Sequence, residues 1–173
     1  MKIVSIDIGI KNLAICIIDD KLEIYDWKII DISSNEKKTS IDVLANNIYT
    51  GLDTVSNNWT GIDNVLIENQ PALKNPTMKT VQVLVYGYFH SQKMKGVPLS
   101  VQFISAKSKL NVTDVIKCTK YKSKYANNKM SSVLTTEHYL KDHVKCVFFD
   151  GNKKKDDLSD CFLQAIYFIQ NKC

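Results

Sequence analysis

The sequence predicts an α/β protein in which a mixed five-stranded sheet is flanked by helices. Three strand-like runs open the chain, at residues 2–9, 12–19 and 22–30, and such closely spaced runs pair as antiparallel neighbours. Helical and strand patterns alternate after them, which is typical of parallel strands joined by helices. The chain has 173 residues, of which 45% are hydrophobic and 24% charged. This length and composition favour one folded domain spanning residues 1–173.

The first half of the chain contains clear turn and helix signals. Asp19-Asp20-Lys21 predicts the hairpin turn between the second and third strands, and residues 31–39 predict a polar loop. Ser40 is a good helix N-cap. The helix that follows, which Asn57 to Gly61 should end, has one apolar face made of Ile41, Leu44, Ala45, Ile48, Leu52 and Val55.

The middle of the chain predicts a strand, a helix and another strand. Residues 65–67 form a short apolar strand that leads directly into Glu68. Thr77 can cap a helix over residues 77–94, and residues 101–104 predict the next strand. The inward stripe expected on that helix consists of Val81, Leu84, Val85, Tyr88 and Phe89.

The last third of the chain changes in character. Lysines interleaved with Tyr121 and Tyr125 fill the segment 105–129. A short strand is predicted at 147–149 and a final helix from about Lys155 to Gln170. Between the lysine-rich segment and that strand we expect a helix whose inward residues are Val133, Leu134, His138 and Tyr139.

The charge pattern favours a polyanionic partner. The net charge is +5, and every basic residue is lysine, because the chain contains no arginine. Lysine binds phosphate as a point charge, whereas arginine suits bidentate reading of guanine edges. The surface therefore suits contact with a nucleic-acid backbone better than sequence readout.

Cysteine usage and hydropathy indicate the compartment. The five cysteines form no CxxC pair, which favours a reducing compartment and no zinc site. The chain enters a strand at once, without room for a targeting signal, and no apolar run approaches the roughly 20 residues of a membrane span. We expect a cytoplasmic protein without a membrane partner.

Two acids lie at the ends of apolar strands. Asp7 ends the run Ile3-Val4-Ser5-Ile6, and Glu68 ends Val65-Leu66-Ile67. Burying an unpaired carboxylate costs several kcal/mol at least, so a divalent metal ion is the expected partner. The structural alternatives are an Asp that bonds to turn amides and a surface Glu at a strand end.

The final helix supplies two further acids. Asp157 and Asp160 are three residues apart, share a face and border the apolar stripe of Leu158, Phe162 and Ile166. The helix dipole alone also favours acids in the first turns, and this explanation is preferred for Asp156. Four converging carboxylates would repel one another, and two Mg²⁺ ions roughly 4 Å apart would relieve that repulsion and activate water for attack on a phosphodiester.

These segments resemble a known family. Residues 5–12 (SIDIGIKN), 66–71 (LIENQP) and 155–162 (KDDLSDCF) resemble RNase H-like nucleases of the RuvC type. Within that group they are similar to the Holliday junction resolvases of poxviruses, other large DNA viruses and yeast mitochondria. The resemblance spans nearly the whole chain and implies an RNase H-like fold, viral origin and, for a viral protein, the cytoplasmic replication site of the host cell.

The resemblance also implies the site residues. Metal ligands would be Asp7, Glu68, Asp157 and Asp160, holding Mg²⁺, for which Mn²⁺ can substitute. A catalytic basic residue is best matched by Lys129, with Lys124 second, although either lysine can equally be a phosphate contact or plain surface charge. The predicted DNA contacts are Lys11, Asn12, Gln70, Lys107, Lys120, Lys122 and Lys124.

The expected activity is that of an endonuclease that nicks two opposed strands of a four-way DNA junction. A symmetric homodimer would place one metal site on each strand, and the helix at 77–94 is a candidate for its interface. Tyr121 and Tyr125 are either base-stacking or packing residues. The alternatives are a non-catalytic RNase H-like nucleic-acid-binding protein and, disfavoured by only six glycines, an actin-like ATPase fragment.

Overall fold

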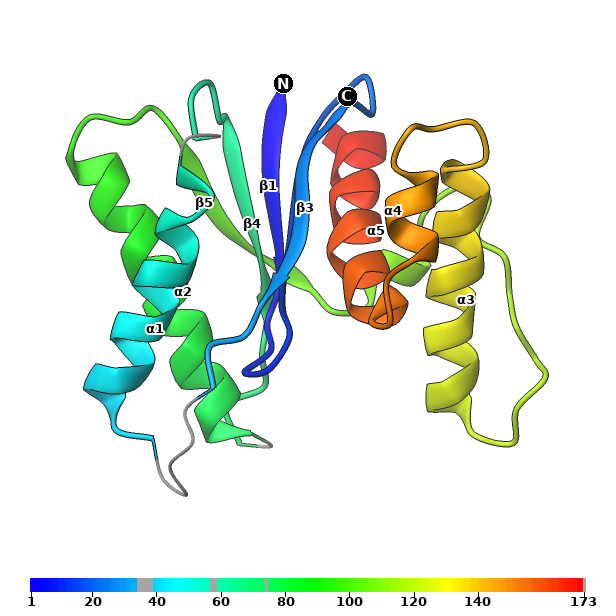
Figure 1. The fold of residues 1–173 in the computed structure, drawn as a ribbon, viewed down its shortest axis with the longest axis horizontal. Coiled ribbons are helices and arrows are strands. Elements are labelled where there is room, and N and C mark those ends of the chain that lie inside the picture. Colours follow the sequence, from blue (N-terminus) through cyan, green and yellow to red (C-terminus); the bar gives the residue numbers. More distant parts are fainter. Residues whose placement is uncertain (34–38, 57–58, 74, 173) are drawn as a thin grey trace.

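The computed structural model describes residues 1–33, 39–56, 59–73 and 75–172 (Figure 1). Its elements are, in chain order, β1 (Lys2–Asp7), β2 (Leu13–Asp19), β3 (Ile24–Ile30), α1 (Ile41–Asp53), β4 (Asn64–Asn69), α2 (Pro76–Met94), β5 (Ser100–Ser105), the 3-10 helix η2 (Ser108–Leu110), α3 (Lys124–Tyr139), α4 (Cys146–Asp150) and α5 (Lys155–Lys172). Predictions made for Asn57, Cys173 and part of the loop 31–39 lie outside the described residues.

The five strands form one mixed sheet in the order β3-β2-β1-β4-β5. β2 pairs antiparallel with β1 and β3, while β4 pairs parallel with β1 and β5. The predicted fold class is therefore confirmed. β1 and β4 pair with Ile6 beside Ile67, so Asp7 and Glu68 follow as neighbours at one end of the sheet. Side chains alternate along a strand, so both carboxylates point to the same face.

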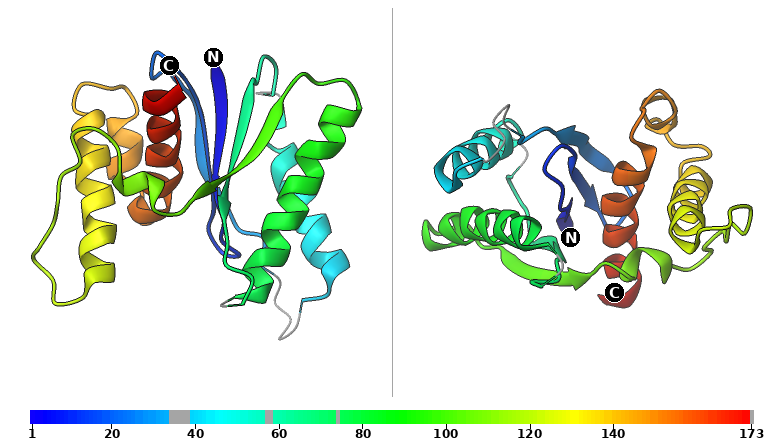
Figure 2. Two further views of the ribbon diagram at one scale, coloured as in Figure 1. Left: turned by 180° about the vertical axis from the view of Figure 1, so that it is seen from behind. Right: turned by 90° about the horizontal axis from the view of Figure 1, so that it is seen from below.

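Helices cover both faces of the sheet (Figures 1 and 2). α1 and α2 lie on one face, and α5 lies on the other with α3 and α4 outside it. Leu52 and Phe89 are buried in the first layer. In the second layer, the Trp27 ring stacks on Phe149 with centroids 5.3 Å apart, and its Nε1 donates to the Leu158 carbonyl oxygen at 3.2 Å. These contacts fix α4 and α5 against β3.

Several predicted helix and turn signals are confirmed. The Ser40 hydroxyl accepts a hydrogen bond from the Val43 backbone nitrogen at 3.3 Å. The hairpin turn between β2 and β3 is closed by Leu22 N, which donates to the Asp19 carbonyl oxygen at 3.0 Å. The cap of α2 differs: Asn75, not Thr77, accepts from the Met78 backbone nitrogen, because Pro76 fits the first helical position and has no N–H that needs an acceptor.

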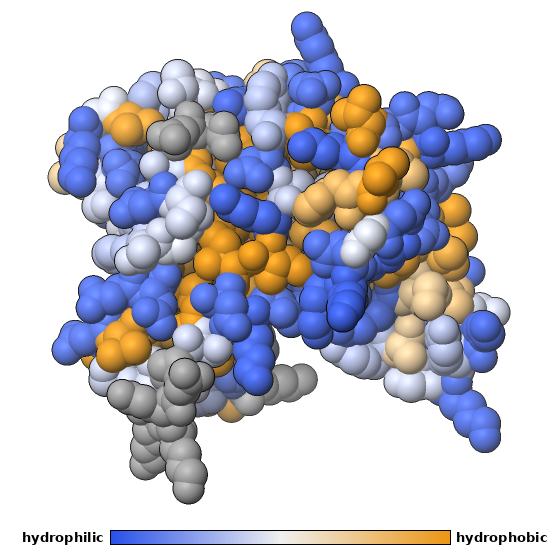
Figure 3. Space-filling model, viewed as in Figure 1, coloured by the Kyte–Doolittle hydropathy of each residue, from blue (hydrophilic) through white to orange (hydrophobic). Residues whose placement is uncertain are grey.

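The strand predicted at 147–149 is wrong, because this segment forms the short helix α4. Val144 and Val147 are 81% and 82% exposed and only Phe149 is fully buried, so the run lacks the two-sided burial that a central strand needs. Apolar side chains accordingly show on the surface over α4 and the turn before it in Figure 3. A run of three apolar residues does not distinguish a strand from one helical turn.

The inward face predicted for α3 is confirmed for Val133 and Tyr139, which pack against the core, and is wrong for His138. His138 is exposed, and the buried side chains are Ser131, Ser132, Thr135 and Thr136. Two of these hydroxyls hold the preceding segment: Ser131 Oγ accepts from the Cys118 backbone nitrogen at 2.8 Å, and Thr135 Oγ1 accepts from that of Ile116 at 2.9 Å. Small hydroxyl side chains are buried here because they supply the partners that an irregular backbone requires.

Candidate active site

Asp7 and Glu68 lie side by side at the ends of β1 and β4 and are only 8% and 6% exposed. Both face α5. The turn after Asp7 is tight at Gly9, where an added Cβ would lie 2.4 Å from the Asn12 carbonyl oxygen. Glycine is therefore required for β2 to return beside β1, where Ala14 pairs with Asp7.

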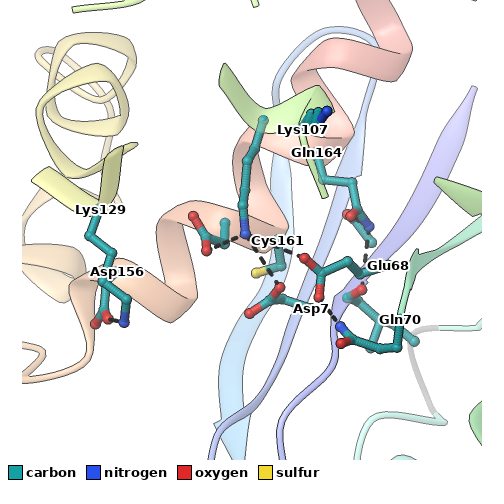
Figure 4. Close-up of polar contacts among 12 residues, drawn as sticks. Asp7, Glu68, Gln70, Lys107, Lys129, Asp156, Cys161 and Gln164 are labelled. Atoms are coloured by element: carbon teal, nitrogen blue, oxygen red, sulfur yellow. Dashed lines mark hydrogen bonds and ion pairs between the residues drawn. The ribbon is translucent and has the colours of Figure 1, made fainter. Parts of the chain in front are cut away.

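α5 brings the third carboxylate to the same place. Asp160 lies in the early turns of α5, between the buried residues Ser159 and Cys161. One turn farther on, the buried Gln164 Nε2 donates to Ser5 Oγ, Ile6 O and Leu66 O at 3.1, 3.3 and 3.4 Å. Figure 4 shows Gln164 reaching the strands beside Glu68. These bonds fix the position of α5 relative to β1 and β4, and with it the position of Asp160.

A lysine lies among the three carboxylates. Lys109 is on η2, just after β5, and its Nζ lies 3.8 Å from Asp7 Oδ1 and 3.5 Å from Glu68 Oε1. The same Nζ donates a hydrogen bond to Asp160 Oδ2. One ammonium group thus neutralises three acids that arrive from β1, β4 and α5.

The electrostatics of this cluster demand positive charge. Burial, followed by the nearby Glu68 carboxylate, raises the pKa of Asp7 well above its usual range, and burial also raises the pKa of Asp160 although Lys109 opposes it. Burial alone would lower the pKa of Lys109, but the surrounding carboxylates outweigh it and raise that pKa. One lysine does not fully offset the cost of these buried acids.

The donor chemistry of the cluster fits a hard divalent cation. Within the described ranges, no three His, Cys, Asp or Glu side chains are arranged closely enough to hold a metal ion as they stand. The Lys109 ammonium instead supplies the positive charge on which Asp7, Glu68 and Asp160 converge. Asp157 Oδ2 is buried without a hydrogen-bond partner among the described residues, and burial followed by Asp156 raises the Asp157 pKa. Carboxylate oxygens are among the hard oxygen ligands that Mg²⁺ prefers, together with water and phosphate oxygens.

Lys129 lines the cleft that contains these carboxylates, but its ammonium does not pair with Asp7, Glu68 or Asp160. Its ammonium pairs with Asp156 in the first turn of α5 and lies 5.2 Å from the centre of the Tyr125 ring. Figure 4 shows the Lys129–Asp156 pair apart from Asp7 and Glu68. The structure therefore brings Lys109, which sequence reasoning did not single out, to the carboxylates. Its position just beyond the carboxyl end of a parallel strand, where ligand sites gather, was the available signal.

The carboxylates form the floor of an open cleft of about 730 Å³. Three of the predicted DNA contacts, Gln70, Lys107 and Lys124, line it. α3 forms one wall, with the Tyr125 ring 69% exposed. The other predicted DNA contacts, which do not line the cleft, are Lys11, Asn12, Lys120 and Lys122.

A protein-family comparison adds a decisive observation. The family model described as poxvirus A22 protein matches residues 1–172. The chain belongs to the poxvirus A22 protein family. Uncharacterized protein L451 of Acanthamoeba polyphaga mimivirus is 30% identical over 148 residues, which are 78% of this chain and 36% of that protein. The A22-family chain thus spans about a third of the length of this curated relative.

Solved structures establish the fold of this A22-family chain as RuvC-like. The yeast mitochondrial Holliday junction resolvase Ydc2 is similar with a TM-score of 0.66 and 16% identity, covering 97% of this chain and 78% of its own. Thermus thermophilus RuvC in complex with a Holliday junction substrate gives a TM-score of 0.61 and 11% identity over 98% of this chain and 95% of its own. In the described part of the chain, no helix is both long and apolar enough to cross a membrane.

Proposed function

We propose that this A22-family protein is a divalent-metal-dependent endonuclease that resolves four-way DNA junctions by nicking opposed strands. The observation that carries the proposal is the convergence of Asp7, Glu68 and Asp160 on one positive charge at the floor of the cleft. Relatives with this fold include a Holliday junction resolvase and a protein bound to a junction. The enzyme would process branched viral DNA during recombination and replication.

The carboxylates of Asp7, Glu68, Asp157 and Asp160 would hold the metal. When bound, Mg²⁺ supplies an activated water and neutralises charge on the phosphate under attack. The protein contributes rigid placement, because Gln164 ties α5 to β1 and β4. Asp157 would accept a proton or orient water, since its Oδ2 has no partner among the described residues.

Lys109 would stabilise negative charge on the phosphate as it is attacked. Its ammonium already lies among the carboxylates, whereas Lys129 is engaged by Asp156. Lys129 then lies in the wall of the cleft, where its ammonium packs over one face of the Tyr125 ring. In this proposal the catalytic basic residue is therefore Lys109, and not Lys129 as the sequence predicted.

DNA would enter between the β4 end of the cleft and α3. Lys107 and Lys124 line the cleft and offer phosphate contacts that carry no sequence information. The exposed Tyr125 ring, with a lysine beside it, offers a stacking surface for a base that is unpaired at the crossover.

A homodimer would match the two-fold symmetry of a four-way junction. The outer side of α2 and the neighbouring edge strand β5 expose apolar side chains, with Val83 at 55% and Phe103 at 46% exposure. The Tyr86 ring joins them, 5.4 Å from the Phe103 ring. Such a surface suits a second copy of the chain, because an isologous dimer pairs one patch with itself.

A panel of DNA substrates tests the proposal. Purified protein is incubated with Mg²⁺ and, in turn, a four-way junction, a three-way junction, a fork and a linear duplex. The proposal predicts paired nicks on opposed strands of the four-way junction and little cutting of duplex. Equal cutting of duplex and junction would refute the structure specificity, and no cutting of any substrate would refute the enzymatic function.

A further inference from the structure

We propose that Gln82 is a positioning residue for Glu68. It fixes the segment after β4 to α2, so that Gln70 holds the Glu68 carboxylate in the orientation that the metal site uses. The inference rests on the proposed function, because it assigns Glu68 to that site.

Gln82 is a polar residue in an apolar layer. Its side chain is 0% exposed, and its neighbours on the inner side of α2 include Val81 and Val85, both fully buried, and Phe89 at 1% exposure. Burying a primary amide among hydrocarbon side chains is costly unless hydrogen bonds compensate. The partners that compensate therefore indicate why an amide is present here.

One of those partners belongs to the segment that follows β4, and the other is on α2 itself. Gln82 Oε1 accepts a hydrogen bond from the Gln70 backbone nitrogen at 2.7 Å and a second from Lys79 Nζ at 3.1 Å. Lys79 Nζ also donates to Asn69 Oδ1 at 3.3 Å. α2 thus holds two consecutive residues, Asn69 and Gln70, immediately beyond Glu68.

Gln82 acts on the Glu68 carboxylate through the Gln70 side chain. Gln70 Nε2 donates to Glu68 Oε2, and Figure 4 shows Gln70 beside Glu68. The other carboxylate oxygen, Oε1, lies 3.5 Å from Lys109 Nζ. The two carboxylate oxygens therefore have different donors, which sets the rotation of the group. Gln82 does not line the cleft, so it acts through Gln70 and not on substrate.

Only the oxygen of the Gln82 amide is used. Its Nε2 has no hydrogen-bond partner in the part of the chain that the structure describes. A carboxylate at this position would offer the same acceptor to the Gln70 nitrogen and would gain Lys79 as a counter-charge. A leucine would fill the space and accept nothing.

This asymmetry leads to three variants, each made in the whole 173-residue chain. Gln82→Leu removes the acceptor, Gln82→Glu keeps it, and Val85→Ala removes buried volume from the same helix face without touching the segment after β4. Mutating a residue that orients a metal ligand typically lowers metal affinity or activity by about 10- to 100-fold.

The experiment has three readouts. The first is amide hydrogen exchange at Gln70 in metal-free protein, the second is Mn²⁺ affinity by electron paramagnetic resonance, and the third is kcat and KM for junction cleavage. For Gln82→Leu we expect faster exchange at Gln70, about 10-fold weaker Mn²⁺ binding, and lower kcat at unchanged KM. Gln82→Glu should remain within about 3-fold of wild type, and Val85→Ala should lower Tm only.

The outcomes separate this inference from the proposed function. If wild type cleaves junctions and Gln82→Leu binds Mn²⁺ and cleaves as wild type does, the inference is wrong. Val85→Ala reproducing the loss of Mn²⁺ affinity would reduce Gln82 to a packing residue and overturn it as well. If wild type neither binds Mn²⁺ nor cleaves, the proposed function fails, whatever happens to the Gln70 amide.

Discussion

The ammonium of Lys109 lies 3.8 Å from the Oδ1 atom of Asp7, although η2 and β1 are far apart in the chain. This contact exists because β5 lies parallel to β4 and β4 parallel to β1, so the segments beyond all three strands meet at one end of the sheet. The fold thereby brings two carboxylates and one ammonium group to one point. In the proposed function that point is where the phosphate reacts.

Lys109 should matter more to catalysis than Lys129. Lys109→Met removes the positive charge from the carboxylate cluster, and we expect kcat for junction cleavage to fall about 100-fold or more, because lost transition-state charge stabilisation typically costs that much. Lys129→Met breaks the pair with Asp156 and should lower kcat less than 10-fold. Single-turnover cleavage at saturating Mg²⁺ measures both variants, and the reverse ranking would restore Lys129 as the catalytic lysine.

Metal binding should reverse the stability order of wild type and Asp7→Asn. The raised pKa of buried Asp7 means that its favourable contribution is present below the ordinary Asp pKa of about 3.9 and is lost as pH rises through the folded-state value. In EDTA, Asp7→Asn should therefore have the higher Tm at pH 7, by a margin that shrinks toward pH 4.

Mg²⁺ should then raise the Tm of wild type and leave that of Asp7→Asn almost unchanged, since a ligand at 100 times its Kd adds about 2.7 kcal/mol to stability. Differential scanning fluorimetry over this pH range provides the comparison. An equal Mg²⁺ shift in both proteins would place the bound ion away from Asp7.

The lysines on the cleft wall should set the salt dependence of DNA binding. Lys124→Ala is expected to flatten the slope of log K against log salt by roughly 0.9, the value for one lost phosphate contact. Lys21→Ala, in the exposed turn between β2 and β3, is the matched control and should leave the slope unchanged. Fluorescence anisotropy with a junction from 50 to 200 mM salt, a range that spans large affinity changes, gives both slopes. Equal slopes for Lys124→Ala and wild type would show that Lys124 of α3 does not contact the DNA backbone.

The outer side of α2 should carry the dimer contact. Val83→Glu places a charge on this apolar surface and is expected to shift the protein from dimer to monomer. Val144→Glu introduces the same charge on the exposed α4 side, at 81% exposure, and should leave the dimer intact. Sedimentation velocity distinguishes the two states. A dimer that survives Val83→Glu and dissociates with Val144→Glu would move the interface to α4.

Sequence periodicity was enough to predict the sheet and the placement of Asp7 and Glu68. Both residues end runs of buried aliphatic side chains, and strand ends at one edge of a sheet are close in space whatever the loops do. Lys109 was missed because its importance comes from tertiary structure: many lysines surround it in the chain, and only the geometry of η2 brings this one to the acids.

Gln82 and Gln164 were also invisible to sequence patterns. Each sits on the inner face of a helix where periodicity counts it as a polar interruption, and each acts through hydrogen bonds to distant backbone. The buried hydroxyl residues that were missed on the inner face of α3 have the same origin, since Thr135 and Ser131 are buried for their hydroxyl contacts and not for hydrophobicity. Local patterns predict apolar burial well and buried polar partners poorly.

Junction cleavage by wild type and by Asp7→Asn, each with Mg²⁺ and with EDTA, tests the central claim most directly. Asp42→Asn, an exposed acid in the first turn of α1 on the other face of the sheet, serves as the control. We predict paired nicks by wild type and by Asp42→Asn in Mg²⁺ alone. Asp7→Asn should cleave at least about 100-fold more slowly and bind the junction within a few-fold of wild type. Cleavage by Asp7→Asn at the wild-type rate would contradict the assignment of the active site.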